Sequence, residues 1–211
     1  MKNAYIISAC RTPFGKYGGA LKDVRPDDMA GLVIKEAVRR AGVDPNEIDD
    51  VMIGCANQAG EDNRNIARMG VLLSGLPERV PATTVNRLCG SSLDTIIQAS
   101  RAIMTGEADI IVAGGVESMT RAPYSLPKNV SGAALFGNLT AYDTALGWRY
   151  PNPKLEKMFP LEAMGETADN VAEQWNISRE DQDAFAYESH QRAIAAQEAG
   201  RYDEEIVAVE I

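Results

Sequence analysis

The chain has 211 residues, 45% of them hydrophobic, and carries a formal net charge of −9 at pH 7. It is long enough for one large domain or two small ones, and its acidic balance disfavours nucleic acid and anionic membranes as partners. No apolar run is long enough to span a bilayer, and the first residues lack the pattern of a signal peptide. Three cysteines, one histidine and no C-x-x-C pair predict reduced thiols in a cytoplasm and no metal site.

The first quarter of the chain predicts a strand, a helix and a second strand. Residues Asn3–Cys10 form an apolar run typical of a buried strand, and a glycine-rich loop follows. Asp27–Ala41 predicts an amphipathic helix, with Pro26 suited to its first turn and Gly42 to its exit. Asp50–Cys55 is a second apolar run. This order favours a parallel sheet in an α/β fold.

A polar segment follows the second predicted strand. Asp62 suits the N-cap of a helix from about Asn63 through Leu73. The charged side chains around it favour a solvated or interface ion-pair network over a chemical site; they are Glu61, Asp62, Arg64 and Arg68.

The segment Pro81–Met104 holds the main candidate for chemistry, Cys89. Alternating β-branched residues predict a strand up to Arg87, and apolar residues at helical spacing predict a helix after Gly90. Cys89 would then lie at the amino end of a helix, where unpaired N–H groups favour the thiolate, the nucleophilic form of sulfur. Gly90 leaves space for a substrate to approach. Most free cysteines are inert core residues, so position alone leaves both interpretations open.

A fourth strand and a change of composition mark a predicted domain boundary. Asp109–Glu117 predicts a buried strand, and the two glycines near its end indicate close backbone packing there. The stretch from residue 120 to residue 160 is irregular and rich in proline, glycine and aromatic residues, which is typical of a functional or oligomer-contact segment. We therefore predict an α/β domain over residues 1–120 and a second region over residues 121–211.

The second region predicts two helices and a strand. Met164 opens a helix whose apolar positions recur at helical spacing, and Ser178 begins a capping box for another that runs to about Glu198. His190, the single histidine, lies on a polar face of this second helix, and we interpret it as a surface residue rather than a general base. Glu205–Ile211 alternates as a strand does.

Several of these segments resemble those of the thiolases, a family of acyl-CoA acyltransferases. NRLCGSSLD resembles their nucleophile motif N-x-x-C-G-S-G, with Cys89 on the reactive cysteine and Ser92 where the family commonly has glycine. MGETAD, which begins at Met164, resembles M-G-x-T-A-E with aspartate in place of the last glutamate. RTPFG near the start and VESM after the fourth strand resemble further thiolase segments, and GEDNRN looks most like the 3-oxoadipyl-CoA branch.

The resemblance implies the N-terminal half of a thiolase, with a βαβαβαβ mixed sheet between helix layers and part of an inserted loop domain. It implies Cys89 as the nucleophile that accepts an acyl group, Met164 over the acyl end of the substrate, and a homo-oligomer (dimer or tetramer). Acyl-CoA and CoA are then the substrates, with no metal or organic cofactor. The family's G-H-P histidine and C-x-G-G-G cysteine do not occur in these 211 residues. We therefore expect part of a larger enzyme, with a reactive thiol, little turnover and an exposed apolar surface.

Two other hypotheses stay open at this point. A ketoacyl-synthase-like condensing enzyme would carry its cysteine in an Ala-Cys-Ser/Ala context, which differs from Asn86–Gly90. A non-catalytic truncated chain, acting at most as a binder of acyl-CoA or of a partner, would hold an inert Cys89.

Overall fold

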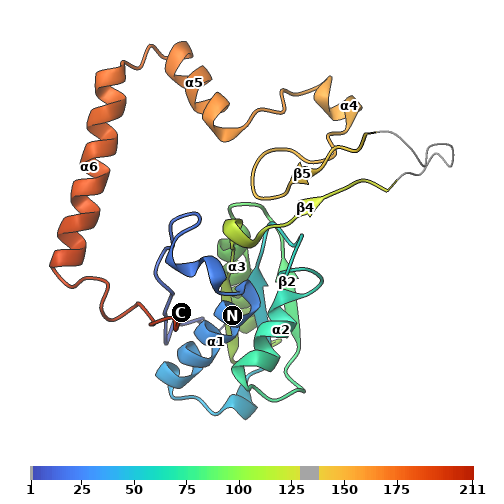
Figure 1. Cartoon of the computed structure of the whole chain (residues 1–211). Coiled ribbons are helices and arrows are strands. Elements are labelled where there is room, and N and C mark those ends of the chain that lie inside the picture. Colours follow the sequence, from blue (N-terminus) through green and yellow to red (C-terminus); the bar gives the residue numbers. More distant parts are fainter. Residues whose placement is uncertain (1, 129–137) are drawn as a thin grey trace. The chain divides into compact units, whose positions relative to one another are not determined.

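The computed structural model of the protein describes residues 2–128 and 138–211 (Figure 1). Contacts within the chain define two compact units, Met1–Pro123 together with Glu205–Ile211, and Tyr124–Glu204. Residues 129–137, part of the predicted irregular segment, lie outside the described residues. The domain division expected after residue 120 stays a prediction, and each unit is described by itself.

A three-stranded sheet forms the centre of the first unit. Its strands are β1 (Asp50–Gly54), β2 (Ala82–Val85) and β3 (Ile111–Gly115), in the order β2-β1-β3, with Ile53 of β1 opposite Gly114 of β3. The sequence predicts all three strands at nearly these positions. The α/β class is confirmed, and the described strands of this sheet are parallel rather than mixed.

Helices α1 (Pro26–Ala41) and α2 (Ile66–Ser74) pack against each other on one face of this sheet. Proline in the first turn of α1 and Gly42 at its carboxyl end, with a left-handed φ of 66°, define its limits as predicted. The two helices and alternate residues of β1 share one buried core, in which each large aliphatic side chain contributes roughly 1.5 to 3 kcal/mol. Its members are Ala30, Ile34, Val38, Ile48, Val51, Ile53, Cys55, Ile66, Ala67, Val71, Leu76 and Val80.

Helix α3 (Ser91–Thr105) contacts the other face of the sheet at very close range. A Cβ atom added at Gly54 would lie 2.4 Å from the backbone nitrogen of Ser92, and one added at Gly115 would lie 1.8 Å from the Ser92 Oγ. Glycines at the ends of β1 and β3 therefore allow the first turn of α3 to rest directly on the sheet. This confirms the close packing predicted at the end of β3.

Two of the predicted strands do not form in the described part of the chain. Residues Asn3–Cys10 form no strand, and Ile6 is 82% exposed. Glu205–Ile211 makes one parallel bridge, between Ile206 and Arg11. An apolar run becomes a buried strand only where neighbouring strands satisfy its backbone and a second layer covers it. The described residues provide such backbone pairing only at this one bridge, so both strand predictions are wrong for this structure.

The second unit holds short strands and three helices within its described residues. Strands β4 (Tyr124–Ser125) and β5 (Tyr142–Asp143) pair antiparallel, and α4 (Pro153–Glu156), α5 (Met164–Gln174) and α6 (Arg179–Glu198) follow. The two predicted helices are confirmed. As expected, Ser178 is the N-cap of α6, with its Oγ accepting the backbone N–H of Asp181 at 3.1 Å. Within the described ranges, no helix has the length and apolar character needed to cross a membrane.

Candidate active site

The turn between β2 and α3 presents Cys89 at the amino end of a helix. Cys89 is exposed and directly precedes Gly90, the N-cap residue of α3. No side chain caps this helix end. The sulfur therefore belongs to an accessible turn beside the positive end of the helix dipole. The predicted placement of Cys89 is confirmed, whereas its chemical role stays a prediction.

Two polar side chains hold the turn that carries Cys89. Leu88 adopts a left-handed φ of 51°, which residues other than glycine seldom adopt. The Asn86 Oδ1 accepts the N–H of Leu88 at 3.0 Å. The Ser91 Oγ accepts the N–H of Arg87 at 2.9 Å and donates to the carbonyl of Leu88 at 2.6 Å. Asn86 and Ser91 both belong to the motif segment NRLCGS, but the sequence pattern does not indicate that their side chains hold the turn.

A buried carboxylate anchors a positive charge next to the same turn. Asp94, in the first turn of α3, is only 5% exposed. Its carboxylate pairs with Arg87 at 3.2 Å and accepts a hydrogen bond from Gln98 at 2.7 Å. The Arg87 side chain itself stays 71% exposed. An anion that approaches Cys89 therefore meets a cationic group two residues away along the chain.

The loop after β1 folds around Asp62, whose side chain is buried. Its carboxylate accepts the N–H groups of Gln58 at 3.2 Å and Gly60 at 2.9 Å, and the Cys55 thiol lies 3.6 Å from it. The expected N-cap role of Asp62 is wrong, because Asn65 caps α2 by accepting the N–H of Arg68 at 3.1 Å. Asp62 instead satisfies the backbone of the loop that leads into the helix.

Burial makes Cys55 an unreactive thiol. Desolvation, together with the nearby charge of Glu117, raises the pKa of Cys55 to about 12. Cys55 is fully buried, so at neutral pH it stays protonated and out of reach. Of the two thiols Cys55 and Cys89, only the latter is exposed.

Cys55, Asp62 and Glu117 bring three potential metal ligands within 4.8 Å of one another. The chemistry of this group fits a hydrogen-bond network better than a metal centre. The Cys55 thiol lies 3.6 Å from the Asp62 carboxylate, which also accepts the N–H groups of Gln58 and Gly60. The Glu117 carboxylate accepts the backbone N–H of Ala56, and desolvation raises its pKa above the ordinary value. The carboxylates of Asp62 and Glu117 thus both accept hydrogen bonds from backbone N–H groups, as expected for a structural network.

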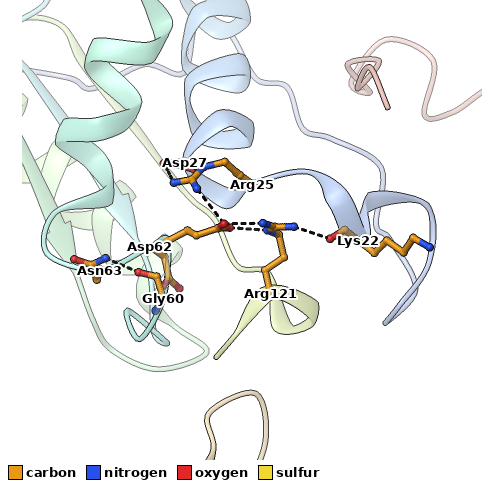
Figure 2. Close-up of polar contacts among 8 residues, drawn as sticks. Lys22, Arg25, Asp27, Gly60, Asp62, Asn63 and Arg121 are labelled. Atoms are coloured by element: carbon orange, nitrogen blue, oxygen red, sulfur yellow. Dashed lines mark hydrogen bonds and ion pairs between the residues drawn. The ribbon is translucent and has the colours of Figure 1, made fainter. Parts of the chain in front are cut away.

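An ion network joins three separate parts of the first unit (Figure 2). The carboxylate of Glu61 accepts two hydrogen bonds from Arg121, each at 2.6 Å, and one from Arg25 at 3.0 Å. Arg25 also pairs with Asp27 at 2.8 Å, and Arg121 donates to the carbonyl of Lys22 at 3.1 Å. Arg121 ends the short helix η3 (Met119–Arg121), so the network fixes that helix to the start of α1 and to the loop after β1.

The predicted ion-pair network is therefore right for Glu61 and wrong for Asp62 and Arg68, while Arg64 is an exposed residue of the loop. Asp62 binds backbone N–H groups, and Arg68 donates to the carbonyls of Val80 and Glu78, each at 2.8 Å. The partners of Glu61 lie 36 and 60 residues away along the chain, at Arg25 and Arg121. Local charge patterning cannot indicate such distant partners.

Replacing Glu61 with glutamine should remove a pH-dependent part of the stability. Hydrogen bonds from Arg121, and the charges of Arg121 and Arg25, hold the pKa of Glu61 below its ordinary value. The folded state thus binds this proton less readily than the unfolded state. The stabilisation is full above the unfolded glutamate pKa of about 4.3 and is lost as the pH falls through the lowered folded pKa.

In urea unfolding at pH 7, Glu61→Gln is expected to be less stable than the wild type by about 1 to 2 kcal/mol. The difference should shrink as the pH is lowered from about 5 to about 3. Glu78→Gln, at an exposed carboxylate, is the matched control and should change little at either pH. If the free energy of unfolding differs by the same amount between Glu61→Gln and the wild type at every pH in this range, folding is not linked to the protonation of Glu61.

The other candidate residues lie in the second unit. Met164 is the first residue of α5 and is 76% exposed. His190 lies within α6 and is exposed, as expected for a surface residue. Cys89 and Met164 thus belong to different units, and a joint role for them stays a prediction.

An accessible thiol at the amino end of a helix, on an α/β sheet, suits enzymes that form a covalent intermediate on sulfur. A family model described as "Thiolase, N-terminal domain" matches residues 4–211. The chain therefore belongs to the thiolase family, which confirms the resemblance of its motifs.

Curated relatives and a solved structure agree with this assignment. The chain is 57% identical over 213 residues to "Beta-ketoadipyl-CoA thiolase" of Acinetobacter baylyi, covering 100% of this chain and 52% of that protein. It is 53% identical over 210 residues to "3-oxoadipyl-CoA/3-oxo-5,6-dehydrosuberyl-CoA thiolase" of Escherichia coli K12, covering 99% and 52%. The crystal structure of the Bacillus anthracis acetyl-CoA acetyltransferase is similar with a TM-score of 0.88 at 39% identity, covering 100% of this chain and 52% of that one. The chain spans about half the length of these relatives.

Proposed function

We propose that this chain supplies the nucleophile half of an acyl-CoA acyltransferase of the thiolase type. The whole enzyme would cleave a 3-oxoacyl-CoA with CoA, or condense an acyl-CoA with acetyl-CoA in the reverse direction. In the condensing direction, the Cys89 sulfur first attacks the thioester carbonyl of the acyl-CoA, so that an acyl–sulfur bond forms on Cys89 and the bond to the CoA sulfur breaks. CoA leaves as its thiol and carries away the proton that Cys89 loses.

The observation that carries this proposal is the exposed Cys89 at the start of α3, in a chain whose residues 4–211 match the thiolase N-terminal domain. The uncapped helix end and the neighbouring Arg87 favour the approach of an anionic substrate. The motif around Cys89 and the family match favour a thiolase over a ketoacyl synthase. The names of the relatives suggest a 3-oxoadipyl-type substrate.

The remaining parts of the proposal come from the family. Met164 is proposed to lie over the acyl end of the substrate, and the enzyme is proposed to be a homo-oligomer that acts in the cytoplasm. The thioester itself is the activated group, so the reaction is proposed to need no metal or organic cofactor.

Incubation of the 211-residue chain with acetyl-CoA tests the assignment. One acetyl group is expected on Cys89, located by peptide mass analysis, and none in Cys89→Ser. Cys55 and Cys10 serve as internal controls. The former is fully buried, and burial raises the pKa of both thiols, so neither should be acetylated.

The result also separates the proposal from the hypothesis of a non-catalytic binder. If iodoacetamide alkylates Cys89 but acetyl-CoA never acetylates it, the acyl-transfer role of this chain is refuted. Cleavage of acetoacetyl-CoA by the chain alone is expected to be negligible, because its one histidine is His190 on the exposed α6. Rapid cleavage would show that the base lies within these residues after all.

A further inference from the structure

The backbone of Ala56, just after β1, joins the ends of all three strands of the sheet through its N–H and its carbonyl group. Its N–H donates to the carboxylate of Glu117, which follows β3. Its carbonyl accepts a hydrogen bond from the Asn86 Nδ2 at 3.0 Å, and Asn86 follows β2. One residue thus links the carboxyl ends of β1, β2 and β3, the edge at which α/β sheets place their sites.

The other end of the Asn86 side chain holds the residue before the candidate nucleophile. Its Oδ1 accepts the N–H of Leu88 at 3.0 Å, and Leu88 has the unfavourable φ of 51°. A bulky residue stays in the left-handed region only where its surroundings fix it there. Asn86 therefore bonds Ala56 at the sheet edge and Leu88 in the turn. Leu88 directly precedes Cys89, so its backbone conformation sets the direction of Cys89.

We infer that Asn86 is a positioning residue for Cys89, a role that rests on the function proposed for that cysteine. By bonding Ala56 and Leu88 at once, Asn86 keeps Leu88 left-handed and the sulfur at the amino end of α3. Glu117 supports this arrangement by accepting the backbone N–H of Ala56. Ser91 also holds the turn, but both of its bonds are to Arg87 and Leu88 within the turn, so it does not fix the turn to the sheet.

The test compares the rate at which iodoacetamide alkylates Cys89 in the full 211-residue chain. In Asn86→Ala the sulfur is no longer fixed at the helix end, and the rate should fall about two- to fivefold, the size of a helix-terminus effect on a charged group. Asn86 is exposed, so the thermal unfolding midpoint should change little. Asn63→Ala is the matched control, because Asn63 is also exposed and bonds a loop carbonyl, that of Gly60, away from the turn. Its alkylation rate should equal that of the wild type.

Two further variants separate positioning from general stabilisation. Asn86→Asp keeps the acceptor for the Leu88 N–H but has no donor for the Ala56 carbonyl, so the turn loses its bond to the sheet and the rate should fall about as far as in Asn86→Ala. In Asn86→Ala/Leu88→Gly, glycine adopts a positive φ without strain, so much of the lost rate should return although the Asn86 side chain is absent.

The proposal is overturned if Cys89 in Asn86→Ala is alkylated as fast as in the wild type, or if Asn86→Asp, which lacks the bond to Ala56, keeps the wild-type rate. It is equally overturned if Leu88→Gly fails to restore any of the rate. Acetylation by acetyl-CoA is measured on the same variants. Absent acetylation with the expected alkylation pattern would refute the acyl-transfer function and leave the positioning role supported.

Discussion

Replacing Gly54 with alanine is expected to destabilise the first unit by about 3 kcal/mol or more, because overpacking here meets backbone atoms. The added Cβ atom would lie 2.4 Å from the Ser92 backbone nitrogen and 2.5 Å from the Ser91 carbonyl carbon. Neither atom can move without displacing the first turn of α3, which begins two residues after Cys89. Urea unfolding should show the lost stability, and the alkylation of Cys89 should change with it.

Gly114→Ala is the matched control for this experiment. Gly114 lies in the same sheet, opposite Ile53, and its added Cβ atom would have its nearest neighbour at 3.9 Å, the Ile53 Cδ1. A strand glycine with that much space should tolerate alanine within about 1 kcal/mol. The lower flexibility of alanine in the unfolded chain offsets part of the cost. Equal stability of Gly54→Ala and Gly114→Ala would refute the close contact between β1 and α3.

Regular elements with strong local patterns were predictable from the sequence. Local information suffices for α1. Its apolar face, the proline of its first turn and the glycine that caps its carboxyl end all lie in one short stretch of the chain. The same holds for α3 and the three strands of the sheet. The position of Cys89 at a helix start follows from these boundaries and needs no knowledge of distant contacts.

The failures depend on what other parts of the chain supply. Asn3–Cys10 has the composition of a buried strand, but burial needs covering atoms, and Ile6 is 82% exposed here. The choice between Asp62 and Asn65 as helix cap is a different case. Both residue types cap helices well, and only the fold of the loop decides that Asn65 takes that place.

The candidate site was predictable as a position but not as a structure. The motif identifies Cys89, yet it does not reveal that Asn86 bonds Ala56, 30 residues earlier in the chain. It also does not reveal that Glu117, which follows β3, accepts the N–H of the same Ala56. These bonds form only when the three strands are adjacent, so their partners are set by sheet topology rather than by sequence spacing.

Gly115→Ala is expected to cost about 2 to 3 kcal/mol, and Ser92→Gly is expected to recover part of that loss. The added Cβ atom at Gly115 would lie 1.8 Å from the Ser92 Oγ and 2.9 Å from the Ser92 Cβ. Ser92 is the position at which this chain departs from the glycine of the thiolase motif. The departure is thus accommodated by a glycine across the contact, on β3.

A double-mutant cycle measures this coupling through urea unfolding of the wild type, both single variants and the double variant. Ser92→Gly alone should cost about 0.5 to 1 kcal/mol, as glycine does in a helix. The double variant should be more stable than Gly115→Ala, with a favourable coupling of about 1 to 2 kcal/mol. Full recovery is not expected, since the Gly54 carbonyl would still lie 3.0 Å from the new Cβ atom. Strictly additive losses would mean that Ser92 does not face Gly115, and the packing of α3 on the sheet would have to be revised.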